Sequence, residues 1–73
     1  MNITELPETM KVIRKQKRLS CLELARMVDK DTSQISRWER GITEPSLEEI
    51  EKVFEAMGYS VKVVVREKGE YRV

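Results

Sequence analysis

The chain has 73 residues, enough for one domain with a thin hydrophobic core, and domains of this size often need a disulfide, a metal ion or a second subunit. Cys21 is the only cysteine and there is no histidine. An intrachain disulfide is therefore excluded, and the commonest metal ligand and general base are missing. We expect no metal and no cofactor, so a partner subunit is the remaining source of stability.

The net charge of +1 is unevenly distributed along the chain. Residues 1–40 carry nine Lys and Arg against six Asp and Glu, a net charge of +3. Residues 41–73 carry five Lys and Arg against seven Asp and Glu, a net charge of −2. Groups that bind phosphate are therefore expected in the first half. The chain lacks a signal pattern and any apolar run near the ~20 residues that cross a bilayer, so we expect a cytoplasmic protein with no membrane partner.

The first predicted helix begins between Thr4 and Glu8 and ends near Lys17. Met10 and Ile13 give it an apolar stripe at helical spacing.

Two short helices are predicted to follow. Ser20 and Glu23 have the spacing of a capping box, in which the side chain of each residue accepts a hydrogen bond from the backbone amide of the other. Asp31 and Gln34 repeat this spacing before the next helix, which should end at Gly41 because glycine readily adopts the left-handed conformation found there.

A fourth helix is predicted between Ser46 and Gly58, again with a capping box, which Ser46 forms with Glu49. Its apolar residues recur at helical spacing and should face the core. They are Leu47, Ile50, Val53, Phe54 and Met57.

The tail changes its period. From Tyr59 to Val65 apolar and polar residues alternate, which indicates a β-strand. A turn at residues 67–69 would allow residues 70–73 to form a second strand, so both a hairpin and a single strand are compatible with the sequence.

The second and third helices, joined by a turn of about three or four residues, have the layout of a helix-turn-helix unit. The run from Arg14 to Met57 resembles the Cro and phage-repressor type of helix-turn-helix, the xenobiotic-response-element family. The matching segments are Ile13-Arg14, Leu19-Ser20, Leu24-Ala25, Val28, Ile35 to Gly41, Pro45-Ser46-Leu47 and Ala56-Met57-Gly58.

This resemblance implies a mainly α fold, a four- to five-helix lambda-repressor-like domain in residues 1–58, followed by a short β-strand or hairpin in residues 59–73. It also implies a transcriptional regulator, with repression as the expected mode, that reads a palindromic operator in the major groove of double-stranded DNA. Arg14 and Glu39 occupy positions that pair in this family and hold the first helix against the third. Trp38 lies on the same face as Ile35 and is expected in the core.

The sequence departs from the family pattern at three positions. Asp29 stands where the turn usually has glycine, but aspartate tolerates left-handed dihedrals better than most residues. Lys30 replaces a residue that is usually apolar. Cys21 replaces a glutamine that binds a DNA phosphate, although the helix amides there can still meet a phosphate.

The family pattern places Thr32, Ser33 and Arg37 on the exposed face of the recognition helix, aimed at base edges. An arginine can contact guanine O6 and N7 together, so Arg37 is the leading candidate for base recognition. Candidates for contacts to the DNA backbone or flanking bases are Gln34, Ser36, Arg40, Lys17, Arg18 and Cys21. The alternative for these side chains is a solvated surface, and for Ser33 it is helix capping.

We expect a homodimer because the predicted strand has no sheet to join within a helical domain. Its dimer contacts would come from Tyr59, Val61, Val63 and Val65. The alternative function is that of an antitoxin, which would bind a toxin protein through this tail and also bind its own operator. An enzyme is disfavoured because no nucleophile stands beside a base, and RNA binding because stacking aromatics are lacking.

Overall fold

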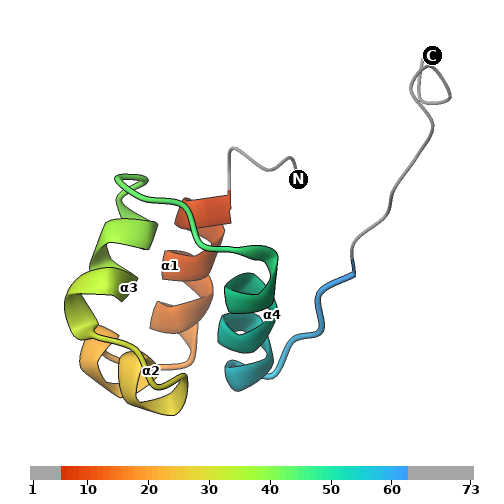
Figure 1. The fold of residues 1–73 in the computed structure, drawn as a ribbon. Helices are drawn as coiled ribbons and strands as arrows, with labels where there is room; N and C mark the ends of the chain where they lie inside the picture. Colours follow the sequence, from red (N-terminus) through yellow and green to blue (C-terminus); the bar gives the residue numbers. More distant parts are fainter. Residues whose placement is uncertain (1–5, 63–73) are drawn as a thin grey trace, which may run out of the picture.

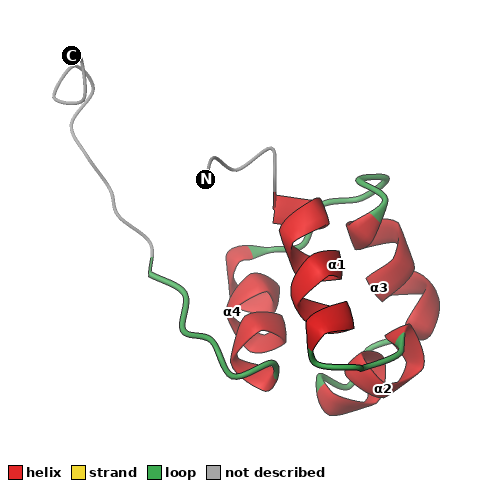
Figure 2. Cartoon of the chain, turned by 180° about the vertical axis from the view of Figure 1, so that it is seen from behind, coloured by secondary structure: helices red, strands yellow, loops and turns green. Residues whose placement is uncertain are grey.

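The computed structural model describes residues 6–62, and residues 1–5 and 63–73 lie outside the described part. The described chain folds into α1 (Leu6–Gln16), α2 (Cys21–Met27), α3 (Thr32–Glu39) and α4 (Leu47–Ala56). In the two opposite views α1 lies between α3 and α4, and α2 crosses one end of the bundle (Figure 1 and Figure 2). The prediction of a mainly helical fold is confirmed.

The core is formed by one face of each helix. Ile35 and Trp38 of α3 are buried, as predicted, and they pack with Met10 of α1 and Leu24 of α2. The other buried apolar residues are Ala25, Ile50, Val53, Phe54 and Met57. One expectation was wrong: Leu47 is 56% exposed, because it is the first residue of α4 and no described element covers it.

Two of the three predicted capping boxes are confirmed. The Ser20 hydroxyl accepts from the Glu23 amide at 3.0 Å, and the Glu23 carboxylate accepts from the Ser20 amide at 2.9 Å. The box between Ser46 and Glu49 has the same pair of bonds at 3.1 and 2.8 Å.

The third predicted capping box, at the start of α3, is wrong. Asp31 is the N-cap residue and has extended dihedrals, but its side chain makes no capping hydrogen bond within the described chain. The amide of Gln34 instead donates to the main-chain carbonyl of Asp31 at 3.0 Å. The donor that the carboxylate would have used is therefore already engaged.

All four helices end in the same way, with a residue of positive φ followed by an amide that donates back to a carbonyl five residues earlier, which is the Schellman motif. The residues of positive φ are Gly41, as predicted, and Gly58, together with Asp29 at 58° and Arg18 at 57°. Asp29 thus keeps the turn between α2 and α3, whereas the left-handed conformation of Arg18 was not predicted.

After α4 the chain reverses its direction and runs back toward the level at which α4 begins (Figure 1). Tyr59 to Lys62 lie in neither a helix nor a strand. The rest of the predicted strand, including Val63 and Val65, and the predicted hairpin lie outside the described residues. Among the described helices, none is long and apolar enough to cross a membrane.

Candidate nucleic-acid interface

The seven-residue α2 and the eight-residue α3 pack on each other and form the helix-turn-helix unit. Leu24 and Ala25 are the buried residues of α2, and Ile35 and Trp38 are those of α3. Because the apolar side chains of α3 all lie on one side, the opposite side of the helix is left for contact with a ligand.

That opposite side of α3 carries Ser33, Arg37 and Arg40, which are all exposed and follow one another at intervals of one helical turn. Thr32 is also exposed, at the start of the helix, whereas Gln34 and Ser36 are half-buried at its edges. The Arg40 Nε donates to the Ser36 carbonyl at 3.4 Å, so this side chain lies back along the helix. Ser33 and Arg37, two of the three predicted base-reading residues, therefore share one accessible helix face.

The remaining candidates precede or begin α2, and they are placed differently. Lys17 and Arg18 are exposed in the connection between α1 and α2. Cys21 is half-buried, and its sulfur lies 4.0 Å from Glu39 Oε1, so the thiol faces the interior of the helix-turn-helix unit. The Lys17 ammonium lies 5.5 Å from the centroid of the Tyr59 ring, next to the end of α4.

An ion pair fixes α3 to α1. The Arg14 Nε and Nη2 atoms donate to the two carboxylate oxygens of Glu39 at 2.7 and 3.0 Å, and Arg14 Nη1 donates to the Leu19 carbonyl at 2.7 Å. The Arg14 and Glu39 side chains are only 10% and 5% exposed. The hydrogen bonds that Arg14 donates to Glu39 raise the pKa of Arg14 above its ordinary value, with burial acting in the opposite direction.

A second ion pair fixes the turn of the helix-turn-helix unit to α4. Lys30 Nζ lies 2.9 Å from Glu49 Oε2, while Oε1 of the same carboxylate closes the capping box of α4. The amide of Ser46 and then Lys30 lower the pKa of Glu49, and Glu49 raises the pKa of Lys30. Sequence reasoning missed this pair, although a lysine at a position that is usually apolar was a signal for it.

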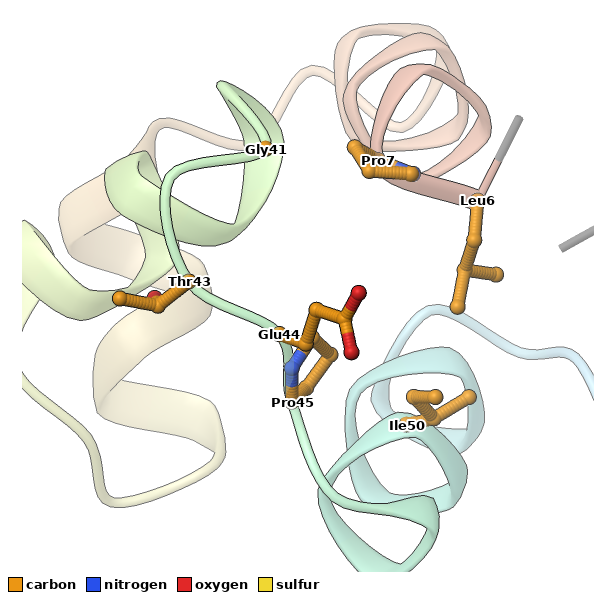
Figure 3. Close-up of a pocket in the computed structure, with 7 residues that line it drawn as sticks. All are labelled: Leu6, Pro7, Gly41, Thr43, Glu44, Pro45 and Ile50. Atoms are coloured by element: carbon orange, nitrogen blue, oxygen red, sulfur yellow. The ribbon is translucent and has the colours of Figure 1, made fainter. Parts of the chain in front are cut away.

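A cleft of about 470 Å³ lies between the start of α1, the chain after α3 and the first turn of α4 (Figure 3). Leu6, Pro7, Pro45 and Ile50 give it apolar walls, and Glu44 supplies the charged side chain of its lining. No group of three or more His, Cys, Asp or Glu side chains suited to a metal ion occurs in residues 6–62.

The fold and the exposed face of α3 define a helix-turn-helix DNA-binding domain. The profile of the helix-turn-helix family of the Cro and phage-repressor type matches residues 10–64, and the chain belongs to this family. It is accordingly a DNA-binding transcription regulator. Comparison with curated proteins and with solved structures gave no significant match.

Proposed function

We propose that this protein is a repressor that binds a palindromic operator as a homodimer, with α3 of each subunit in the major groove. The observation that carries the proposal is the division of α3 into a buried face, with Ile35 and Trp38, and an exposed face, with Ser33 and Arg37. A helix so divided can rest on its own domain and present polar side chains to base edges.

Within this proposal the side chains have separate tasks. Arg37 donates to a guanine, since its five N–H donors match the paired acceptors O6 and N7, while Thr32 and Ser33 contact neighbouring bases or phosphates. Arg40, Arg18 and the half-buried polar residues of α3 contact the DNA backbone. Phosphate contacts set the register of the domain on the duplex, and they make the affinity fall as salt rises.

The buried pair of Arg14 and Glu39 has a positioning role in this proposal. It joins the last turn of α1 to the last residue of α3, and the Cys21 sulfur lies 4.0 Å from the same carboxylate. A small displacement of α3 would misalign Arg37 with its base. The pair thus supports recognition without touching DNA.

The homodimer is proposed to form through the tail. Apolar and polar residues alternate from Tyr59 to Val65, and a strand with this pattern can pair with the same strand of a second subunit across a two-fold axis. Two recognition helices about 34 Å apart would then meet successive turns of one face of the duplex.

The direct test is selection of bound sites from a random duplex library with the full chain. The proposal predicts an enriched inverted repeat whose half-sites lie about 10 base pairs apart, centre to centre. Enrichment of no sequence over the starting library, with uniform affinity for all duplexes, would contradict sequence-specific recognition.

An antitoxin is the second candidate, and the same alternating tail supports it, since such a segment can add a strand to a toxin as well as to its own copy. Expression of the chain with the product of the neighbouring gene, followed by co-purification, separates the two candidates. A stable complex that shields the tail would favour the antitoxin, and separate elution would favour the stand-alone repressor.

A further inference from the structure

The junction between α4 and the tail is held in a defined conformation. Gly58 has a φ of +90°, and the Tyr59 amide donates to the Phe54 carbonyl at 2.9 Å, completing the Schellman motif at the end of α4. These bonds determine the direction in which the chain leaves the helix.

Two side-chain contacts then hold the first residues of the tail against the domain. The Lys17 ammonium lies over the ring of Tyr59, 5.5 Å from its centroid, in the geometry of a cation–π contact. Val61 is half-buried and packs against the hydrophobic core. Tyr59 and Val61, which lie two residues apart, therefore both contact their own domain, and the tail is fixed at its root.

Lys17 is exposed, and its backbone continues the end of α1. Its amide donates to the Ile13 carbonyl at 3.0 Å, which continues the last turn of α1, and its ammonium lies 3.8 Å from the position that a Cβ on Gly58 would occupy. The side chain thus bridges the end of α1 and the end of α4. Lys17 was a candidate for contact with the DNA backbone, and in the structure its ammonium lies over the Tyr59 ring.

We propose that Tyr59, held by Lys17, sets the half-site spacing that the dimer accepts. This inference rests on the proposed function, because it concerns a dimer joined through the tail. If the tail joins the subunits, the stiffness of its root decides how freely each recognition helix can shift relative to the other.

The size of the shift is set by the geometry of the duplex. Adding one base pair between half-sites moves one half-site by about 3.4 Å along the axis and rotates it by about 34°. A domain held at the root of the tail cannot follow this movement, whereas a domain on a loose root can. The Tyr59 contact therefore becomes a determinant of specificity for spacing and not for base sequence.

The test uses the full chain and duplexes that carry two copies of the selected half-site, with the spacing varied by up to two base pairs in each direction. The variants are Tyr59→Ala, which removes the ring, and Lys17→Met, which removes the ammonium. Tyr59→Phe is the matched control because it keeps the ring face. Each variant is first compared with the parent for thermal melting and for binding to a duplex with one half-site.

We expect the parent and Tyr59→Phe to lose about tenfold in affinity for each base pair away from the best spacing, and Tyr59→Ala and Lys17→Met to lose less than about threefold. A general loss of affinity in Lys17→Met would lower binding at every spacing alike. The ratio of its affinities at two spacings can therefore still be compared with that of the parent. Profiles as steep in both variants as in the parent would overturn the inference while leaving the repressor proposal intact. A parent that binds one half-site as a monomer would contradict the tail-mediated dimer and the inference with it.

Discussion

Removal of the Glu39 carboxylate by Glu39→Ala is expected to destabilise the domain strongly. The substitution deletes the acceptors of two hydrogen bonds from Arg14, at 2.7 and 3.0 Å, and leaves the guanidinium with its bond to the Leu19 carbonyl. Arg14 is only 8% exposed, so water cannot replace the lost partner without a rearrangement of α1. A charge that loses its partner inside a protein costs about 3–5 kcal/mol.

For a domain of this length, each kcal/mol lowers the melting temperature by about 4–8 °C, so the lower estimate of 3 kcal/mol corresponds to a loss of about 12–24 °C. Thermal unfolding followed by circular dichroism measures this change. Glu48→Ala is the matched control, because Glu48 pairs with Lys52 at 3.5 Å while its side chain is 80% exposed. An exposed pair of this kind contributes less than about 1 kcal/mol. If Glu39→Ala melted within a few degrees of the Glu48→Ala variant, the structural role of the buried pair would be refuted.

Three further predictions follow from the described residues. Asp29→Gly should raise the free energy of unfolding by about 0.5–1 kcal/mol, because glycine adopts the left-handed conformation of this turn more readily, and an unchanged or lower value in urea unfolding would contradict this. The hydrogen bond from the Ser46 amide and the Lys30 ammonium lower the pKa of Glu49 from 4.5, so this carboxylate stabilises the fold above the unfolded pKa and loses that effect as the pH falls through the lowered value. In Glu49→Gln the loss of stability below pH about 4.5 should be smaller than in the parent, and identical pH profiles would speak against the pair. If the proposed dimer forms through the tail, truncation after Gly58 should leave a monomer in sedimentation, and a truncated chain that is dimeric would show that another surface joins the subunits.

The four helices could be predicted because their boundaries depend on residues close in sequence. Ser20 with Glu23 and Ser46 with Glu49 cap their helices through bonds within a single turn, so a four-residue pattern was sufficient. The failure at Asp31 has a local cause as well: the main-chain carbonyl of Asp31 took the Gln34 amide, and a pattern of residue types does not reveal such competition.

The contacts that hold the helices together were harder to predict. Arg14 and Glu39 are 25 residues apart, and only the family resemblance linked them. The pair of Lys30 with Glu49 and the contact of Lys17 with Tyr59 depend on the packing of distant helix ends, which neither propensity nor spacing encodes.

The left-handed conformation of Arg18 was unpredictable for another reason. Arginine has no preference for positive φ, and Arg18 adopts it within the Schellman motif in which the Leu19 amide donates to the Arg14 carbonyl at 3.1 Å.

The measurement that tests the account most directly is the affinity of Arg37→Ala for the selected operator and for a random duplex of equal length at the same salt concentration. Arg37 lies exposed on the face of α3 opposite Ile35 and Trp38, and it is proposed to read a guanine. We predict a loss of about 1–3 kcal/mol on the operator and little change on the random duplex, with Lys52→Ala, an exposed change on α4, leaving both affinities near those of the parent. An equal loss on the two duplexes would show that Arg37 binds phosphate, and unchanged affinity for both would contradict the assignment of α3 as the recognition helix.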